Sequence, residues 1–395
     1  MSTLLITNVF PPKAGGSGRW FWELYRRLPR EEYVVAAGRW PGSVEFDQSH
    51  DVQIQRIPLQ FRTWGLCGVR PIFDYVTAWR RLRAMQITFA VQYVHAGCAL
   101  PEGYLAWLFK RYRRLPYAVF VHGEELQVFR SSRELTWMAN RVFRDANLII
   151  ANCRNTANLL AEWPVTSGRV EVMYPGVDTK KFVPSPPSLE ARNELGWGQR
   201  PTILTVGRLQ RRKGHENLIR ALPQVRVRIP NVLYAIIGDG ADRSRLEQLV
   251  NTLGLSDHVR FYGTIDDDVI RRAYQQCDLF ALPNHEVNGD FEGFGIVLLE
   301  AQACGKPVIA GASGGTKEAV DSGKTGLIMD CEIHCDLARI ISELLLDAQR
   351  RDELGRQARQ WTTERFDWQC LSKRAQFLFA SATKVAKARA ANPAD

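Results

Sequence analysis

Short apolar segments alternate with amphipathic segments along most of this sequence, a pattern that predicts strands separated by helices. Alternating strands and helices are typical of parallel sheets of the Rossmann type. We therefore expect an α/β chain with doubly wound sheets, and a helical end from about Cys335 to Ala390. The predicted strands are Leu4–Val9, Val34–Ala37, Val91–His95, Tyr117–Val121 and Leu148–Ala151, then Ile203–Val206, Val232–Ile237, Val259–Tyr262, Asp278–Leu282, Val308–Ala310 and Gly326–Met329.

The length and one segment rich in Pro and Gly predict two domains. At 395 residues the chain exceeds one ordinary hydrophobic core. Pro and Gly concentrate between Met173 and Ser188, which indicates a linker. We expect a first domain over residues 1–174, a linker over 175–200 and a second domain over 201–370. Helices at about 370–390 are expected to pack back on the first domain.

The composition is that of a globular protein outside the membrane. Hydrophobic residues make up 45% of the chain and charged residues 24%, with no apolar run of about 18 residues. The first ten residues lack a basic leader and read as a strand, so we expect a cytoplasmic protein. Cys331, His334 and Cys335 offer too few ligands for zinc, which favours free thiols.

The net charge of +10 is concentrated in the first half of the chain. Residues 1–174 contain 22 Lys and Arg against 14 Asp and Glu. Trp79–Arg83 and Leu108–Arg114 mix basic and aromatic side chains at helical spacing, which suits an anionic surface such as lipid headgroups. A nucleic-acid backbone has the same charge, but we expect no nucleic-acid partner. The alternative is a plain solvated helix face.

Two carboxylates eight residues apart, Glu292 and Glu300, bracket a glycine-containing apolar run. If a helix begins near Gly295, its N-terminus forms an anion site and the two carboxylates lie on one side of it. Carboxylates accept hydrogen bonds from the hydroxyls of sugars or ribose. The run therefore indicates a ligand rich in hydroxyls, unless it is an ordinary helix with a solvated Glu at each end.

Other strand ends supply groups suited to phosphate. Arg208 follows a predicted strand directly, and Lys213 comes five residues later. These cations can neutralise phosphate, so with the Glu pair they describe a cleft for a nucleotide sugar. In the first half, Gly15 and Gly16 lie in a strand–turn–helix segment, where glycine lets backbone amides approach an anion. His122 follows a predicted strand, at the edge where doubly wound domains bind ligands.

The run from Glu292 to Ala310, continuing into Gly314-Gly315-Thr316-Lys317-Glu318, resembles the retaining glycosyltransferases of the GT-B fold, family 4. The likeness covers nearly the whole chain. It implies two Rossmann-like domains facing across a cleft. Because the implied donor contacts come from both halves, we expect domain closure about a hinge formed by the linker near Pro175 and the C-terminal helices. Residues Asn288 to Gly295 also look like the bacterial phosphatidylinositol mannosyltransferase branch.

The resemblance implies a role for each candidate residue. Glu292 would lie by the donor hexose, Glu300 would hold the nucleotide ribose, and His122 would position the sugar. The donor-binding residues it implies are Gly15, Gly16, Arg208, Lys213, Gly293, Phe294, Gly295, Ile296 and Glu300. The first loop departs from the family, because Gly16-Ser17-Gly18-Arg19 lacks the acidic residue common there. That departure leaves the acceptor contacts of this loop open.

The expected chemistry follows from the charges that develop as the anomeric bond breaks. Arg208, Lys213 and helix N-terminal amides would stabilise the leaving diphosphate. Retention is implied by resemblance, with attack on the face of departure and the diphosphate taking the acceptor proton. Double displacement with Glu292 as nucleophile is the alternative. Neither route needs a cofactor or a metal.

Other motifs point to other classes. Asp266-Asp267-Asp268 fits the Asp-x-Asp pattern of metal-dependent transferases, but its position predicts the acidic first turn of a helix. Gly311-Ala312-Ser313-Gly314-Gly315 matches a hydrolase elbow, yet only His334 follows it. A nucleotide-sugar epimerase and a non-enzymatic basic binding module are the remaining alternatives.

The sequence thus predicts a hexosyltransferase with a nucleotide-sugar donor and a glycan or lipid-linked acceptor. The branch likeness favours GDP-mannose, and a UDP-sugar for glucosyl or N-acetylglucosaminyl transfer is the alternative. The basic first domain predicts a peripheral position on the inner membrane face.

Overall fold

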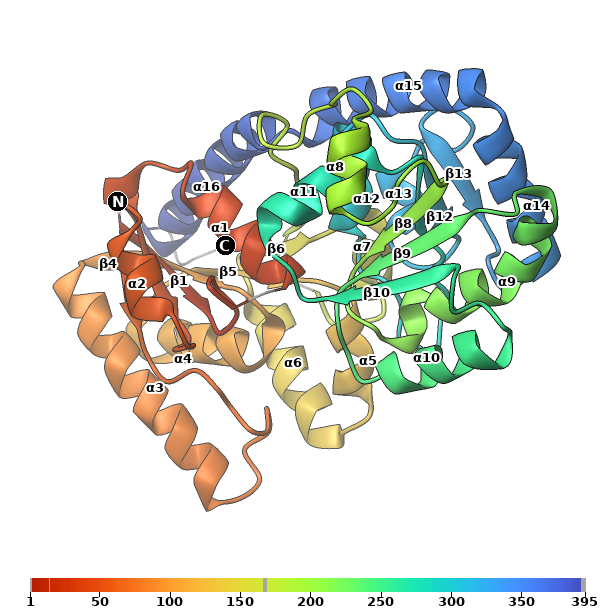
Figure 1. Ribbon diagram of the computed structural model, residues 1–395. Coiled ribbons are helices and arrows are strands. Elements are labelled where there is room, and N and C mark those ends of the chain that lie inside the picture. Colours follow the sequence, from red (N-terminus) through yellow and green to blue (C-terminus); the bar gives the residue numbers. More distant parts are fainter. Residues whose placement is uncertain (1, 14, 166–168, 392–395) are drawn as a thin grey trace. The chain divides into compact units, whose positions relative to one another are not determined.

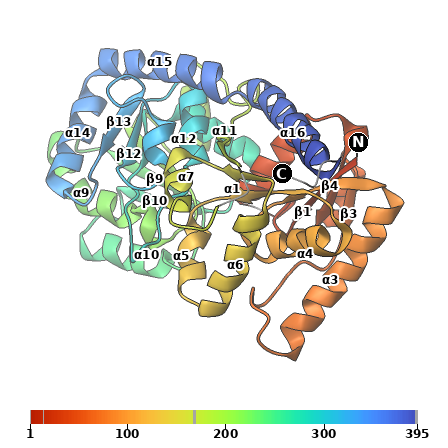
Figure 2. The same cartoon turned by 180° about the vertical axis from the view of Figure 1, so that it is seen from behind.

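The computed structural model describes residues 2–13, 15–165 and 169–391 of the chain. It divides into two compact units, which Figures 1 and 2 show from opposite sides. The first unit comprises Met1–Pro175 and Trp368–Asp395, and the second comprises Gly176–Asp367. Among the described residues, no helix combines the length and the apolar character needed to cross a membrane.

The first unit contains a seven-stranded sheet with the order β3-β2-β1-β4-β5-β6-β7, in which neighbouring strands are parallel. The strands are β1 (Ser2–Thr7), β2 (Tyr33–Ala37), β3 (Ile54–Arg56), β4 (Val91–Ala96), β5 (Tyr117–Val121), β6 (Leu148–Ala151) and β7 (Arg169–Val172). The helical elements are α1 (Gly16–Tyr25), η1 (Arg30–Glu32), α2 (Ser43–Gln48), α3 (Val69–Thr88), η2 (Ala99–Gly103), α4 (Tyr104–Arg113), α5 (Glu124–Arg130), α6 (Arg133–Asp145), α7 (Arg154–Leu160) and α16 (Trp368–Ala391).

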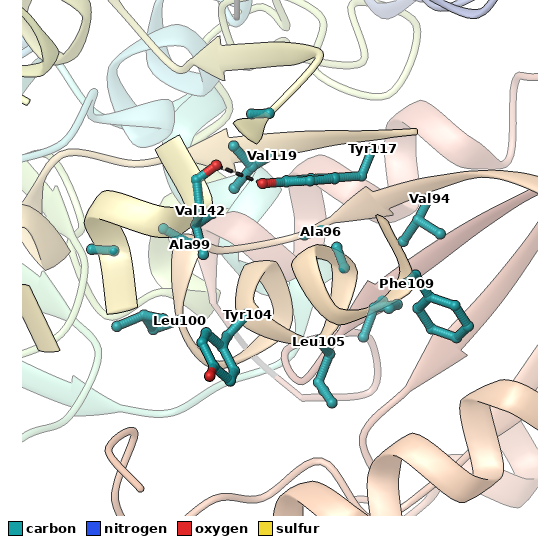
Figure 3. Packing of buried hydrophobic residues seen from close by; sticks show 14 of the residues in the cluster. Val94, Ala96, Ala99, Leu100, Tyr104, Leu105, Phe109, Tyr117, Val119 and Val142 are labelled. Carbon is teal, nitrogen blue, oxygen red and sulfur yellow. Dashed lines mark hydrogen bonds between the residues drawn. The ribbon is translucent and has the colours of Figure 1, made fainter. Parts of the chain in front are cut away.

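Successive residues of β5 face opposite sides of this sheet, so one strand serves two cores. Val119 belongs to the core formed with α3, α4 and α6, whereas Phe120 belongs to the core formed with α1 and α16. Figure 3 shows the first of these cores, where the Tyr117 hydroxyl donates a hydrogen bond of 2.6 Å to the Val142 carbonyl. Both faces of the sheet are therefore covered, as the apolar strands predicted.

Two strands of this sheet were missed by the sequence pattern. Each is an edge strand, β3 beside β2 and β7 beside β6. β3 has three residues, Ile-Gln-Arg, and β7 reads Arg-Val-Glu-Val, so neither presents the continuous apolar run that marks a central strand. The prediction that the series ends with Leu148–Ala151 was therefore wrong.

The second unit contains a six-stranded parallel sheet with the order β10-β9-β8-β11-β12-β13. All six of its described strands were predicted. They are β8 (Thr202–Val206), β9 (Leu233–Ile237), β10 (Val259–Gly263), β11 (Leu279–Leu282), β12 (Val308–Gly311) and β13 (Gly326–Met329). The helical elements are α8 (Leu189–Glu194), η3 (Arg211–Lys213), α9 (His215–Arg228), α10 (Arg243–Thr252), α11 (Asp267–Gln276), α12 (Ile296–Ala303), α13 (Thr316–Ala319), α14 (His334–Leu346) and α15 (Ala348–Phe366).

Helices cover both faces of the second sheet. One core joins the sheet to α9, α10 and α14, and Figures 1 and 2 show α9 and α14 side by side. On the other face α12 contacts β11 and β12 and packs against α15. The sheet is thus doubly wound, and its strand ends lie between helices whose positions are fixed by packing.

The segment expected as a linker, residues 175–200, is instead packed into the second unit from Gly176 onward. Trp197 is 1% exposed, and the Arg192 guanidinium lies against main-chain carbonyls, including that of Gly198 at 2.8 Å. Pro and Gly predicted a linker because they interrupt regular structure. Here the aromatic and arginine side chains between them provide the packing that composition alone does not reveal.

One backbone contact holds the turn after β8 against the end of β11. Gly214 has φ +71°, and a Cβ built on it would lie 1.7 Å from the carbonyl oxygen of Pro283. No side chain fits there, because a backbone carbonyl held at a strand end cannot move aside. The loops that follow β8 and β11 therefore pack backbone against backbone at this glycine.

We expect Gly214→Ala to lower the free energy of unfolding by about 3 kcal/mol, since the left-handed backbone is strained and the new methyl group overlaps a backbone atom. Gly254→Ala is the matched control, because Gly254 has φ +63° and a Cβ added there would meet nothing within 4 Å. This control substitution should lower the free energy of unfolding by about 1 kcal/mol. Urea unfolding measures both, and equal losses would contradict the proposed overlap.

Candidate active site

The turn after β8 divides its cations between the surface and the interior. Arg208 and Arg211 are exposed, whereas Arg212 is 5% and Lys213 8% exposed. Arg211, Arg212 and Lys213 all lie on the 3-10 turn η3, so an exposed cation and two buried cations are immediate neighbours in the sequence. Both buried cations point to the same carboxylate.

That carboxylate is Glu292, in the loop between β11 and α12. Its Oε2 lies 2.6 Å from Nη1 of Arg212 and 2.6 Å from Nζ of Lys213. Nε of Arg212 also lies 3.3 Å from Oδ1 of Asp290. Glu292 is 7% exposed, so three charged groups form a compact buried cluster. We refer to Arg212, Lys213 and Glu292 as the charge cluster.

The charge cluster keeps Glu292 ionised. Burial by itself would raise the pKa of this carboxyl, but the positive charges of Lys213 and Arg212 outweigh burial. The pKa of Glu292 is therefore lowered from its ordinary value, with a further contribution from the charge of Arg208. An ionised carboxylate can accept hydrogen bonds from hydroxyl groups and can face developing positive charge.

The backbone of Glu292 is held from the opposite side by the loop after β12. The N–H of Gly315 donates to the Glu292 carbonyl at 3.0 Å. Gly314 has φ +64°, and a Cβ there would lie 2.1 Å from the same carbonyl oxygen. Asn284 ties the loops further, since its Oδ1 accepts from the N–H of Gly311 at 3.0 Å. Glu292 is thus fixed by main-chain contacts as well as by charge.

The predicted helix start near Gly295 is confirmed. Gly295 is the N-cap of α12 with φ +84°, and the helix begins at Ile296. Glu300 lies inside this helix and is 2% exposed, and its Oε2 accepts a hydrogen bond of 2.8 Å from the Tyr274 hydroxyl. Gly293 and Phe294 complete the loop, with the Phe294 ring 3% exposed. The role expected for Glu300 at the ribose stays a prediction.

In the first unit, His122 lies directly after β5, as predicted. Its Nε2 is 2.9 Å from the carbonyl of Gly97 at the end of β4. Its backbone N–H donates to Oε1 of Glu125 at 2.8 Å, and its carbonyl accepts from Nδ2 of Asn152 at 2.8 Å. Groups following β4, β5 and β6 therefore hold the half-buried His122, the first through its ring and the other two through its backbone.

Gly15 and Gly16 lie at the start of α1, which begins at Gly16 with Gly15 as its N-cap. The chain reaches them from β1 through Asn8, whose backbone N–H donates to Oε1 of Glu102 at 2.9 Å. Burial raises the pKa of Glu102 to about 7. The glycine-containing turn is therefore connected to the end of β4 through a buried carboxyl that the sequence did not single out.

The rival motifs have structural explanations. Asp267 and Asp268 form the acidic first turn of α11, as their position predicted. Within the described ranges, no group of three or more His, Cys, Asp or Glu is placed to hold a metal ion. Ser313 lies in the loop after β12 with a buried hydroxyl, and the backbone of that loop supports Glu292.

Sequence reasoning missed Arg212, Asn284 and Tyr274. Arg212 belongs to the run Arg211-Arg212-Lys213, and no pattern indicates which of two adjacent arginines turns inward. Tyr274 precedes the apolar strand β11 and Asn284 follows it. A single polar residue beside a strand gives no periodic signal. A search for polar residues flanking β11 would have found both.

Comparison with known proteins identifies the family. Glycosyltransferase family 4 matches residues 14–181, and glycosyl transferases group 1 matches residues 188–361. The GDP-mannose-dependent alpha-(1-6)-phosphatidylinositol monomannoside mannosyltransferase of Mycolicibacterium smegmatis is 32% identical over 374 residues, or 92% of this chain and 94% of that protein. The chain belongs to glycosyltransferase family 4. The protein of the same description from Mycobacterium tuberculosis is 33% identical over 95% of this chain and 97% of its own length.

A solved structure agrees with this assignment of the fold. HepE of Anabaena, in complex with UDP, has a TM-score of 0.81 at 24% identity and covers 96% of this chain and 100% of its own. The two Rossmann-like units are those of the GT-B fold. As a family 4 glycosyltransferase, the protein is a hexosyltransferase. The resemblance inferred from Glu292–Ala310 is thereby confirmed.

His215, two residues beyond Lys213, makes the fold sensitive to acid. It is 1% exposed, and burial lowers its pKa from 6.5 to about 4. The unfolded chain therefore binds a proton that the folded chain excludes, and stability is lost as the pH falls through this window.

We expect this histidine to contribute a loss of up to roughly 3 kcal/mol in the free energy of unfolding between pH 6.5 and about 4. Urea unfolding across that range measures it. His215→Gln should flatten the pH dependence, whereas His50→Gln, at an exposed histidine, should leave it unchanged. An unaltered slope in the first variant would show that other groups cause the acid sensitivity.

Proposed function

We propose that this family 4 enzyme is a retaining, metal-independent mannosyltransferase that uses GDP-mannose and acts on a lipid-linked acceptor. The observation that carries the proposal is the similarity to the GDP-mannose-dependent mannosyltransferases, which are 32% and 33% identical along more than nine tenths of this chain. Those proteins are named for action on a phosphatidylinositol mannoside, which suggests a glycolipid as acceptor here.

The charges of the second unit suit the donor. Arg208 is exposed at the end of β8, and Lys213 follows it on η3, so both can meet a diphosphate. Glu292 is ionised and suited to the hydroxyls of the sugar. In the proposed reaction the bond from the anomeric carbon to the diphosphate oxygen breaks, and a bond to the acceptor oxygen forms.

The acceptor loses its hydroxyl proton to the leaving diphosphate, so the products are the glycoside and the protonated nucleoside diphosphate. The positive charges of Arg208 and Lys213 stabilise the oxygen that gains charge, which is the role that a divalent cation fills in other transferases. His122 positions the sugar and is not required as a base. Retention follows if attack and departure occur on one face.

The purified enzyme should transfer mannose from GDP-mannose to a phosphatidylinositol mannoside, and EDTA should not prevent this transfer. UDP-glucose and UDP-N-acetylglucosamine should give no product. Formation of the glycosylated lipid is the measurement. Lys213→Ala should reduce kcat/KM by about 10²-fold or more because one donor to the leaving group is lost. Lys324→Ala, at an exposed lysine, should retain activity. Transfer only from a UDP-sugar would reject the proposed donor, and wild-type turnover in Lys213→Ala would remove Lys213 from the site.

The first unit carries an exposed stripe suited to a lipid surface. Val69, Ile72, Phe73 and Val76 follow helical spacing on α3 and are between 41% and 87% exposed. Basic residues continue along the same helix from Arg80. Apolar side chains beside arginines match the boundary between acyl chains and anionic headgroups, and this supports the proposed peripheral membrane position.

We expect the protein to sediment with vesicles of phosphatidylcholine and phosphatidylglycerol at low salt, because screening is then weak. Phe73→Glu should reduce sedimentation at least about tenfold, since it places a charge among the apolar side chains. Val227→Glu makes the same change on α9 at a valine that is 81% exposed, and should have no effect. If the wild-type protein remains in the supernatant, the membrane proposal fails.

A further inference from the structure

Lys213 and Arg212 share one carboxylate, although the proposed function requires Lys213 at the donor diphosphate. In the structure both cations lie 2.6 Å from Oε2 of Glu292. When Lys213 turns toward a phosphate oxygen, its contact with Glu292 weakens. Glu292 is 7% exposed, and a buried carboxylate that loses its partners is strongly disfavoured. Some other group must then keep Glu292 ionised.

Arg212 is suited to this role by geometry. Its guanidinium contacts two carboxylates at once, with Nη1 at 2.6 Å from Glu292 and Nε at 3.3 Å from Asp290. Its own carbonyl accepts from the N–H of His285 at 3.0 Å, which fixes the backbone of η3 to the loop after β11. A guanidinium held through two edges keeps its direction when a neighbouring charge moves.

We propose that Arg212 is a positioning residue that holds Glu292 ionised and in place while Lys213 exchanges this carboxylate for the donor diphosphate. The inference rests on the proposed function and deepens it. The cations then have separate roles, because Arg208 and Lys213 face the diphosphate whereas Arg212 faces Glu292. The exchange preserves pairing of the buried charges, because Lys213 gains a phosphate as it leaves the carboxylate.

The neighbouring Arg211 provides a matched control, since it lies on the same 3-10 turn but is exposed. Arg212→Gln should reduce kcat about tenfold or more, while the KM for GDP-mannose changes less than about threefold. Arg211→Gln should leave both values near those of the wild type. Calorimetry with GDP supplies a readout that needs no turnover: Lys213→Gln should weaken binding, and Arg212→Gln should not.

The pH profile of kcat/KM separates positioning of Glu292 from a purely structural role. The charged groups around this carboxylate are Lys213 and Arg212 on η3, Arg208 at the end of β8 and Asp290 on the same loop. Removal of the Arg212 charge raises the pKa of Glu292, so the acid limb of the profile should move to higher pH. Arg211→Gln should leave the limb unchanged.

A double-mutant cycle with Glu292→Gln identifies the partner through which Arg212 acts. Once Glu292 has no charge to hold, Arg212→Gln should produce little further loss of kcat. If Arg212→Gln does not fold, Arg212→Lys is the substitute variant, because it keeps the positive charge. Its kcat should still be lower than that of the wild type, because an ammonium cannot bridge both carboxylates.

The proposal is overturned if the kcat losses of Arg212→Gln and Glu292→Gln multiply in the double mutant. It is also overturned if Arg212→Gln weakens GDP binding as much as Lys213→Gln does, or if the acid limb of the kcat/KM profile does not move in Arg212→Gln. A wild-type enzyme that binds GDP but transfers no mannose would reject the proposed sugar or acceptor. The binding comparison would still decide the role of Arg212.

Discussion

The second unit depends on one buried carboxylate that must remain paired. Glu292 is held by two cations from the turn after β8, and its backbone is held by the loop after β12. Loss of the two cations would leave an unpaired charge in a protein interior, which is far more costly than loss of a surface ion pair. Three loops from three strand ends therefore have to meet in one arrangement. The parallel sheet makes this possible because it brings the carboxyl ends of its strands to one edge.

Most of the fold could be predicted because central parallel strands are buried on both faces. Such strands must be apolar along their length, so β8, β9 and β12 are visible in the sequence without any alignment. Edge strands carry no such requirement, and β3 and β7 were missed for that reason. The linker prediction extended too far because composition records interruptions of regular structure, while packing of a residue such as Trp197 depends on distant partners.

The site could be predicted only where residue type and position together restrict the chemistry. Glu292 and Lys213 were singled out because a carboxylate before a helix suits hydroxyls and a lysine near a strand end suits phosphate, and the structure places the two side chains in contact. Arg212 was not separated from Arg211, since the phase of a short 3-10 turn is decided by tertiary contacts and not by local sequence. Glu102 was missed because a buried acid within η2 resembles a surface residue until its backbone partner, Asn8, is known.

The contact between His122 and Gly97 also fixes what the imidazole can recognise. A carbonyl oxygen can only accept, so in the neutral ring the proton resides on Nε2 and the lone pair is on Nδ1. A ligand atom that meets Nδ1 must therefore bring a hydrogen of its own. A hydroxyl meets this condition, whereas a methyl ether or a deoxygenated carbon does not. The main-chain carbonyl at the end of β4 thus sets the polarity that the ring offers to a ligand at Nδ1.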